Sequence, residues 1–472
     1  MKMHLNGEWV SRDNVQEVLN PYDNSVVDTV PLASVEDVAT AVNSAERGFK
    51  VMKSLSAHDR YSLLMRASEL IEERKEDLAR TITLEEGKVI SEGRVEADRC
   101  KQTIIVSAEE AKRIQSEVLP LDAAPGNEGK FGFTLRVPVG IVAAISPFNF
   151  PLNLVAHKIG PALAAGNAVV LKPASDTPLS ALKLTEIMLD AGFPPEAIQC
   201  ITGSGAIIGN ALVSNSKIRK VTFTGSQEVG EQICKTAGLK KVTMELGSNS
   251  PLIVMPDADP ERVAKAACMS GFSNAGQVCI STQRVIAHRE IYNDLLDAMA
   301  ETTAAISTGD PLHADTSMGP MIREDDAVRV AKWVREATSD GARVLTGGSH
   351  VGQLFEPTLV ADVSPQMRIS REEIFGPVVG VTEVSDIDTA IALANATNYG
   401  LSAAIFTQNV DWAMKFVREC DSGNLHVNWG TQWRADLMPY GGLKESGMGK
   451  EGPKYAVQEM TEIKMAVFHL SD

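Results

Sequence analysis

Apolar side chains recur at helical spacing through residues 34–116. Leu64, Ala67 and Ile71 fall on one face of a helix with 3.6 residues per turn, while polar residues fill the other face. The pattern predicts packed amphipathic helices. Capping-box spacing, a hydroxyl residue followed three positions later by an acidic one, predicts helix starts at Ser34 with Asp37, Ser56 with Asp59 and Thr83 with Glu86.

Between residues 139 and 247 the pattern changes to short apolar runs separated by helix-like segments. Five such units predict a mostly parallel sheet wound on both faces, with a ligand crevice at the carboxyl ends of its strands. A second alternating region, residues 252–435, predicts another α/β domain, with a cleft between the two. The strands expected in the first region are 141–146, 168–172, 198–202, 220–224 and 242–246.

Two isolated stretches alternate apolar and polar residues with the period of a strand. One contains Phe131, Phe133, Leu135 and Val137, and the other is the segment 463–467. Isolated strands leave edges uncovered, so we expect these two to pair with each other and with a neighbouring subunit. The pattern therefore predicts a homo-oligomer, either a dimer or a tetramer.

Composition narrows the class of protein. The chain has 472 residues, a formal net charge of −16 and no basic run, which argues against nucleic acid or an anionic membrane as a partner. The longest apolar region, 139–171, is interrupted by Pro147, Lys158 and Pro161, so no membrane span is expected. Six cysteines without paired spacing and no signal-peptide pattern predict a cytoplasmic protein, and eight unclustered histidines predict no metal site.

Three residues carry candidate chemistry. Cys279 is either a buried small hydrophobe or, because its approach is polar and glycine-containing, a reactive thiol. Glu245 ends a predicted strand at the crevice, so it is either a base with a pKa raised by burial or a capping or surface carboxylate. Asn149, between two prolines after another strand, is either an oxyanion donor or a turn residue.

Two glycine-containing turns follow predicted strands. Residues 203–209 are spaced one residue more widely than the usual dinucleotide fingerprint, and residues 225–230 open a helix whose free amides suit a diphosphate. The alternative is two ordinary strand-to-helix turns that need glycine for backbone freedom. Neither turn has the lysine of a phosphate-binding loop, which disfavours nucleotide hydrolysis.

Together these motifs indicate a family. Over nearly its whole length and in the same order, the sequence resembles the aldehyde dehydrogenase superfamily, in its non-acylating, NAD(P)-dependent type. The resemblance is closest to the lactaldehyde, non-phosphorylating glyceraldehyde-3-phosphate and phosphonoacetaldehyde dehydrogenase branch. The matching segments are 147–151, 172–175, 223–226, 245–247, 276–279, 372–377 and 439–447.

The resemblance implies an α/β fold with two Rossmann-like doubly wound domains and a small β oligomerisation arm. It places the NAD(P)-binding domain at 1–119 and 141–247, the catalytic domain at 248–450, and the arm at 120–140 and 451–472. Three alternatives remain at this stage. They are a coenzyme-A-acylating relative, a cysteine-dependent hydrolase and a catalytically dead binding relative.

The resemblance also implies catalytic roles. Cys279 resembles the nucleophile that attacks the aldehyde carbon and forms a thiohemiacetal, whose oxyanion Asn149 and the Cys279 amide would hold. Hydride transfer to a nicotinamide then leaves a thioester on the sulfur. Glu245 resembles the base that activates water to release the carboxylic acid.

For the cofactor, the resemblance implies that Lys172 and Ser175 lie at the adenosine ribose and Ser226 at the diphosphate, with Glu373 and Phe375 at the nicotinamide ribose. Ser175 stands where NAD-preferring members often have Glu. Serine tolerates a 2′-phosphate, so we expect NADP to be accepted, with NAD also possible. The other expected cofactor contacts are Ile145, Ser146, Pro147, Phe148, Gly205, Gly209, Phe223, Gly225, Val229, Leu246 and Gly247.

In the substrate tunnel implied by the family, His157 and Arg434 stand where oxidisers of apolar aldehydes usually have aromatics. They favour a short polar or anionic aldehyde, unless Arg434 pairs with Asp436 or another carboxylate and His157 is a satisfied wall residue. Relatives that handle phosphate groups often have Arg at the position of Val278, so a lactaldehyde-like or monoanionic substrate is favoured. The other expected tunnel residues are Phe150, Asn153, Ile280 and Tyr440.

The chain departs from the family pattern at three aromatic or turn positions. Phe148 replaces a frequent Trp, and Tyr440 replaces the Phe of most relatives. Ser248 replaces a frequent second glycine after the segment 245–247, which changes the geometry expected for that turn.

Overall fold

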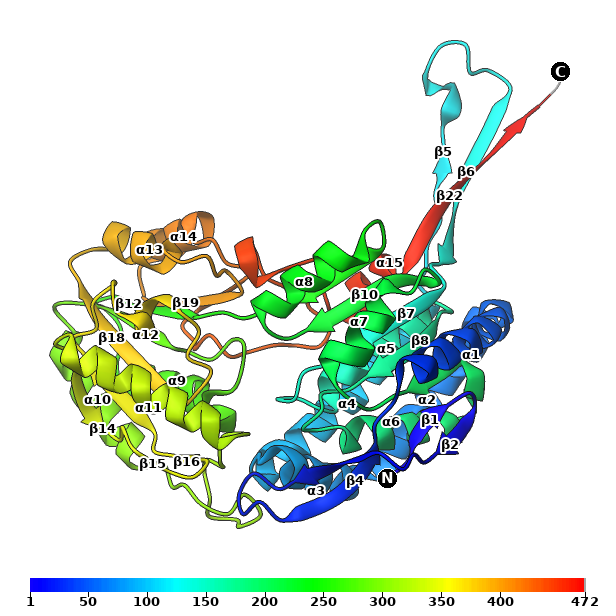
Figure 1. The fold of residues 1–472 in the computed structure, drawn as a ribbon. Coiled ribbons are helices and arrows are strands. Elements are labelled where there is room, and N and C mark those ends of the chain that lie inside the picture. The colour runs from blue at the N-terminus through cyan, green and yellow to red at the C-terminus, as the bar shows by residue number, and fades with distance from the viewer. Residues whose placement is uncertain (471–472) are drawn as a thin grey trace.

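A computed structural model describes residues 1–470. The chain forms two lobes, each built on its own sheet, and a projecting arm of strands (Figure 1). Both sheets are mostly parallel and carry helices, which confirms the predicted α/β fold class. Within residues 1–470, no helix is long and apolar enough to cross a membrane.

The first lobe contains the sheet that the five apolar runs predict. Its eight strands have the order β2-β1-β9-β8-β7-β10-β11-β21, and the five central ones are parallel. The parallel register sets Ile145 opposite Lys172 and Thr224 opposite Glu245. The strands are β1 (Met3–Leu5), β2 (Glu8–Val10), β7 (Ile141–Ile145), β8 (Ala168–Lys172), β9 (Ile198–Cys200), β10 (Ile218–Thr224), β11 (Lys241–Glu245) and β21 (Gly447–Met448).

Four helices precede this sheet along the chain: α1 (Val35–Ser54), α2 (Ala57–Glu73), α3 (Lys75–Glu86) and α4 (Ile90–Ala111). The capping boxes at Ser34 and Ser56 are confirmed, because each hydroxyl accepts from the amide three residues on. The helix start predicted at Thr83 with Glu86 is wrong. These residues form the last turn of α3, which ends at Gly87 with a φ of 88°.

The remaining helices of the first lobe pack against its strands. Helix α5 contacts β7 and β8, and α2 and α4 in turn contact α5, while α8 contacts β10 and β11. A short hairpin, β3 with β4, follows β2. These elements are β3 (Val15–Leu19), β4 (Val26–Pro31), α5 (Asn153–Ala164), α6 (Leu179–Asp190), η2 (Pro195–Ala197), the π-helical turn η3 (Gly205–Gly209), α7 (Asn210–Ser214) and α8 (Gln227–Ala237).

The second lobe has seven strands in the order β14-β17-β18-β13-β12-β19-β20, parallel except for β14. The strands are β12 (Pro251–Val254), β13 (Arg284–His288), β14 (Arg343–Thr346), β17 (Thr358–Ala361), β18 (Val378–Val384), β19 (Ser402–Phe406) and β20 (Asn424–Val427), beside a hairpin of β15 (His350–Val351) and β16 (Leu354–Phe355). The helices are α9 (Pro260–Phe272), η4 (Ser273–Gly276), α10 (Tyr292–Ala304), α11 (Glu324–Ser339), α12 (Arg368–Arg371), α13 (Ile387–Asn395), α14 (Val410–Glu419) and η5 (Lys444–Ser446).

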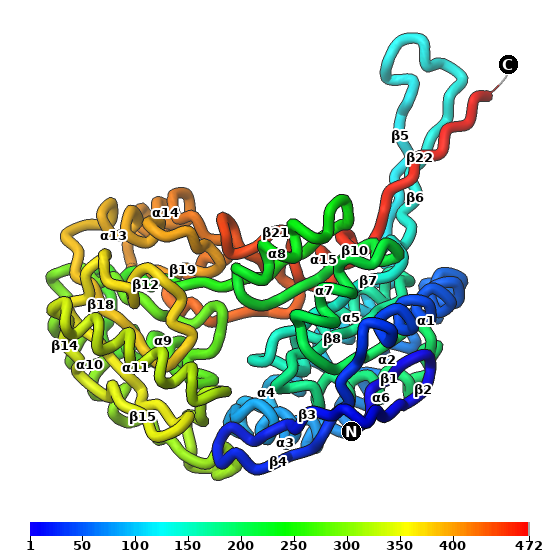
Figure 2. Tube along the Cα trace, in the orientation of Figure 1, coloured from blue at the N-terminus to red at the C-terminus, as the bar shows by residue number. Residues whose placement is uncertain are grey.

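The arm joins segments that lie far apart in the sequence. Strand β22 (Thr461–His469) runs antiparallel beside β6 (Lys130–Pro138), and β5 (Val118–Leu119) pairs with the other edge of β6 (Figure 2). The turn η1 (Leu121–Ala123) lies between β5 and β6, and α15 (Pro453–Glu459) precedes β22 and packs on α4 and α5. The predicted pairing of the two alternating segments is confirmed.

Candidate functional site

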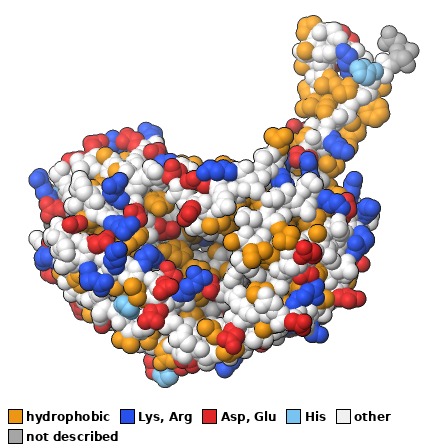
Figure 3. All heavy atoms as spheres, in the orientation of Figure 1, with side chains coloured by type: hydrophobic (Ala, Val, Ile, Leu, Met, Phe, Trp, Pro, Cys, Tyr) orange, Lys and Arg blue, Asp and Glu red, His pale blue; other side chains and the backbone are white. Residues whose placement is uncertain are grey.

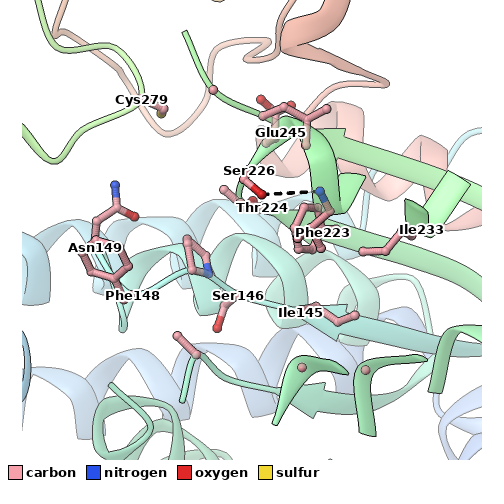
Figure 4. A pocket seen from close by; sticks show the side chains of 18 of the residues that line it. Ile145, Ser146, Phe148, Asn149, Phe223, Thr224, Ser226, Ile233, Glu245 and Cys279 are labelled. Atoms are coloured by element: carbon pink, nitrogen blue, oxygen red, sulfur yellow. Dashed lines mark hydrogen bonds between the residues drawn. The ribbon is translucent and has the colours of Figure 1, made fainter. Parts of the chain in front are cut away.

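Two cavities meet at the carboxyl end of the first sheet. The larger, about 640 Å³, lies over the ends of β7, β8, β10 and β11, and the smaller, about 430 Å³, lies against α4. Cys279 and Glu245 line both cavities. Figure 4 shows them on one side of the larger cavity, with Asn149 across from Cys279. The three residues singled out from the sequence are therefore brought together.

Every predicted cofactor residue except Ser175 lines the larger cavity. Ser175 is not among the lining residues, although its neighbour Ala174 is, and its hydroxyl donates to the carbonyl of Gly203 at 3.2 Å. Its place at the adenosine ribose remains a prediction. Lining residues that the sequence did not single out include Asn210, Gln232, Asp326 and Arg329.

The groups in the larger cavity fit a dinucleotide. Burial lowers the pKa of Lys172 to about 8, which leaves a cation for phosphate at neutral pH. The hydroxyl of Ser226 accepts from the Val229 amide at 3.4 Å at the start of α8, where free amides favour a diphosphate (Figure 4). Gly205 and Gly209 lie beside Lys172, because a Cβ added to either glycine would be 3.8 or 3.9 Å from the Lys172 side chain.

Glu373 supplies a carboxyl acceptor at the other end of this cavity. It accepts from the Ser248 amide at 2.9 Å, and burial raises its pKa to about 7. Gly247 makes this arrangement possible, because a Cβ there would lie 2.2 Å from a carboxyl oxygen of Glu373. A carboxyl group suits the hydroxyls of a ribose. Ser248, the departure from the family pattern, still supplies the amide that holds Glu373.

A strained turn carries Cys279. Asn274 and Ala275 have φ values of 51° and 53°, in the left-handed region that costs an L-residue about 1–2 kcal/mol. Two carboxyl groups from the first lobe hold the turn: Glu86 accepts from the Asn274 amide side chain at 2.8 Å, and Glu92 accepts from its backbone amide at 3.2 Å. Strain of this kind is maintained where the surroundings over-determine it, often at active sites.

The thiol of Cys279 lies 3.1 Å from the hydroxyl of Tyr440. Burial raises the pKa of Cys279 to about 12, so the resting group is a thiol. The side-chain amide of Asn149 is fixed close to Cys279 in the sequence: it donates to the carbonyl of Gln277, two residues before Cys279, at 2.8 Å. The backbone carbonyl of Asn149 is fixed in turn by Lys88, which donates to it at 2.7 Å.

Glu245 is buried, and its two carboxyl oxygens have no hydrogen-bond partner within residues 1–470. Burial, with the nearby Glu451, raises the pKa of Glu245 well above its ordinary value, which gives a strong base once the proton is lost. Lys158 donates to Thr224 at 2.6 Å and to Glu451 at 2.9 Å in the same place. Sequence reasoning did not assign Lys158 to the site; the one signal that could have found it is a lone cation within an apolar helix.

The smaller cavity is lined by the predicted tunnel residues Phe150, Asn153, Val278, Ile280, Arg434 and Tyr440. His157 is also predicted to line this cavity, but it is buried behind the lining residues. Its ring contacts Asp436 at 3.0 Å and Arg434 at 3.1 Å. Burial and Arg434 lower the pKa of His157 to about 4, so it is neutral. This agrees with the alternative interpretation of the sequence, in which the hydrogen bonds of His157 are made within the protein and not to the substrate.

Arg434 is also paired, with Glu451. Both terminal nitrogens of its guanidinium lie 3.3 Å from a Glu451 oxygen, and the group stacks 3.9 Å from the centre of the Tyr440 ring. The sequence did not reveal that one face of α4 also lines this cavity. The residues of this face are Ser91, Glu92, Val95, Glu96 and Arg99.

Comparison with known proteins identifies the family. The profile of the aldehyde dehydrogenase family matches residues 9–466. Over 468 residues the chain is 47% identical to a 3-sulfolactaldehyde dehydrogenase of Priestia aryabhattai, covering 99% of this chain and 98% of that protein. It is 40% identical over 471 residues to a lactaldehyde dehydrogenase of Methanococcus vannielii, with 99% and 100% covered.

Solved structures agree with this result. Aldehyde dehydrogenase 21 from Physcomitrella patens, in complex with the reaction product succinate, superposes with a TM-score of 0.96 at 38% identity, covering 99% of this chain and 98% of that one. An NADP complex of a glyceraldehyde-3-phosphate dehydrogenase from Methanocaldococcus jannaschii gives 0.94 at 37% identity, with 98% and 100% covered. The chain belongs to the aldehyde dehydrogenase family, and it is an NAD(P)-dependent enzyme of the non-acylating branch that its motifs predict.

Proposed function

We propose that this chain oxidises a small polar or monoanionic aldehyde to its carboxylic acid, with NADP or NAD, through a covalent intermediate on Cys279. One observation carries the proposal. The cavity that fits a dinucleotide and the cavity that suits a small substrate share Cys279 and Glu245. A reacting carbon held on the sulfur is therefore open to a hydride acceptor from one side and to substrate entry from the other.

The reaction begins when the Cys279 sulfur, having lost its proton, forms a bond to the aldehyde carbon. The carbonyl oxygen becomes an oxyanion, which accepts hydrogen bonds from the Asn149 side-chain amide and the Cys279 backbone amide. Donors preorganised in this way typically contribute about 10²–10³ in rate each. A nicotinamide held in the larger cavity would supply the acceptor for the hydride that leaves this carbon. The carbon then remains bonded to sulfur as a thioester.

Glu245 completes the cycle. Its ionised carboxylate removes a proton from a water molecule, whose oxygen attacks the thioester and releases the acid and the free thiol. The buried oxygens of Glu245, which lack a partner in the described part of the chain, and its raised pKa support this role. A coenzyme-A-acylating relative has no use for such a base, and a hydrolase has no use for the dinucleotide cavity.

Charge around the smaller cavity supports an anionic or polar substrate. Three of its lining residues are cations, and each pairs with a carboxylate: Lys88 with Glu96 at 2.6 Å, Arg434 with Glu451 at 3.3 Å and Arg99 with Asp436 at 2.9 Å. Arg99 keeps the most donors free. Within residues 1–470 it makes one hydrogen bond, from Nη2 to Asp436, and 28% of its side chain is exposed.

Arg99 is therefore the cation that we assign to the far end of the substrate. Asp436 pairs with both Arg99 and His157. The one positive charge of the Arg99 guanidinium therefore matches a substrate with one negative charge better than a substrate with two. This favours a carboxylate, a sulfonate or a neutral hydroxyaldehyde over a phosphate dianion. The names of the sulfolactaldehyde and lactaldehyde dehydrogenases among the relatives support the same class.

We also propose a homo-oligomer, a dimer or a tetramer, in a reducing cytoplasmic compartment, and the three-part domain division stated above. Hydrophobic side chains gather on the arm (Figure 3), where Phe131, Ile463 and Phe468 are each about half exposed. A second copy would cover them. Light scattering on the purified protein tests this, and a monomer at micromolar concentration would contradict it.

The function is tested by following reduced nicotinamide with a panel of lactaldehyde, 3-sulfolactaldehyde, succinic semialdehyde, glyceraldehyde-3-phosphate and hexanal, each with NAD and with NADP. We expect polar or monoanionic aldehydes to lead, and added coenzyme A to leave the rate unchanged. Cys279→Ser should abolish reduction, whereas the matched variant Cys268→Ser, at a buried thiol beside Thr303, should not. If hexanal had the highest kcat/KM, the substrate class would be refuted. If Cys279→Ser still reduced nicotinamide, the mechanism would be refuted.

A further inference from the structure

In the smaller cavity the nucleophile has Tyr440 as its hydrogen-bond partner. The Tyr440 hydroxyl lies 3.1 Å from the Cys279 sulfur; Tyr440 is buried and Cys279 is partly buried. The backbone of Tyr440 is anchored by two hydrogen bonds to Glu451, one of 3.1 Å and one of 2.7 Å. The phenol is therefore held at the sulfur by fixed backbone, and not by a flexible loop end.

Arg434 fixes the other face of the ring. Its guanidinium lies 3.9 Å from the ring centre and is itself held by Glu451 at 3.3 Å and by His157 at 3.1 Å. A cation over an aromatic face is attracted by the ring electrons, and it draws electron density from the hydroxyl. The same positive charge lies in the neighbourhood of the sulfur, where it favours the thiolate.

We propose that the Tyr440 hydroxyl is a catalytic group, which donates a hydrogen bond to the Cys279 thiolate and so makes the nucleophile available. Arg434 is then a positioning residue for Tyr440, and not a contact to the substrate. The proposal rests on Cys279 being the nucleophile of the proposed function, but it concerns the thiol itself.

The charges around the sulfur explain why such a donor is needed. Burial is the main effect that opposes a negative charge on Cys279, and Glu373 after α12 and Glu245 at the end of β11 add to it. The groups that favour the thiolate are Tyr440 and Arg434. The pKa of Tyr440 is itself raised well above its ordinary value, so the phenol keeps its proton and remains a donor.

The size of the effect follows from the strength of the bond. A hydrogen bond to a charged group is worth about tenfold to a hundredfold in an equilibrium, so its loss lowers the thiolate fraction by that factor. A thiolate of higher pKa is also a better nucleophile, with a Brønsted coefficient of about 0.4–0.5. The observed loss in an alkylation rate is therefore about threefold to tenfold.

The test compares Tyr440→Phe with the wild type, without substrate or cofactor. The rate of Cys279 alkylation by iodoacetamide is measured across a range of alkaline pH, with the modified site identified by peptide mapping. Tyr292→Phe is the matched control, because it removes a hydroxyl of the same lobe that bonds to Asp362 at 3.0 Å, far from the site. Thermal melting of each variant confirms that it is folded.

We expect the profile of Tyr440→Phe to lie about threefold to tenfold below the wild type at each pH, and that of Tyr292→Phe to coincide with it. Aldehyde oxidation by Tyr440→Phe should fall in kcat/KM by a similar factor or more. Alkylation of Tyr440→Phe at the wild-type rate would overturn the proposal. Because alkylation needs no turnover, a failure of the proposed function would appear separately, as a wild type that reduces no nicotinamide.

Discussion

Replacing Arg99 with glutamine removes one positive charge from the smaller cavity and leaves a polar side chain of similar length. In the protein, Arg99 shares Asp436 with His157, its Nε is buried without a partner among residues 1–470, and its side chain lines the smaller cavity. A hydrogen bond to a charged group is worth about 1.5–3 kcal/mol, and each 1.36 kcal/mol is about tenfold. We therefore expect Arg99→Gln to lose about 10- to 100-fold in kcat/KM with an anionic aldehyde, mostly through KM.

The assay compares succinic semialdehyde or 3-sulfolactaldehyde with neutral lactaldehyde on the same enzyme preparation. Lactaldehyde should change by less than about threefold, because it has no charge for Arg99 to hold. Arg94→Gln is the matched control: it removes the same charge from the same helix, at an exposed residue that pairs with Glu76 at 3.0 Å on the surface. An equal loss with both kinds of aldehyde, or an equal effect of Arg94→Gln, would refute the assignment of Arg99.

Three further results are expected. Gly247→Ala should raise the KM for NADP about tenfold, because its Cβ would stand 2.2 Å from the Glu373 carboxylate and displace it; an unchanged KM would contradict the assignment. Lys172 loses its charge as pH rises through its pKa of about 8, so NADP affinity should fall about tenfold between about pH 7 and about pH 9 in a fluorescence titration, and a flat profile would exclude this role. Asn274→Ala should lower the free energy of unfolding by about 2 kcal/mol in urea, because Glu86 loses its 2.8 Å donor, and an unchanged midpoint would count against the clamped turn.

Local patterns predicted the parts of the fold that depend on local chemistry. The five apolar runs became the five parallel strands, and the Ser34 and Ser56 caps formed as expected. The same spacing at Thr83 marks a helix end, because Gly87 takes the left-handed conformation that terminates α3. A capping pattern alone does not show on which side of it the helix lies.

The residues that the sequence missed depend on long-range pairing. Arg99 looks like a solvated charge on an amphipathic helix, and its partner Asp436 is 337 positions away. His157 has the right spacing to face the tunnel, but Asp436 and Arg434 draw it behind the wall. Periodicity fixes the face of a helix, whereas only the packed structure shows what that face meets.

The most direct test of the central claim uses Glu245→Gln, which keeps the shape of the side chain but removes the base. Mixed with lactaldehyde and NADP, this variant should release one burst of reduced nicotinamide per site and then stop. Its intact mass should rise by the lactoyl group, and peptide mapping should place that group on Cys279. Continued turnover at the wild-type rate, or an acyl group on another residue, would contradict a thioester on Cys279 that Glu245 resolves.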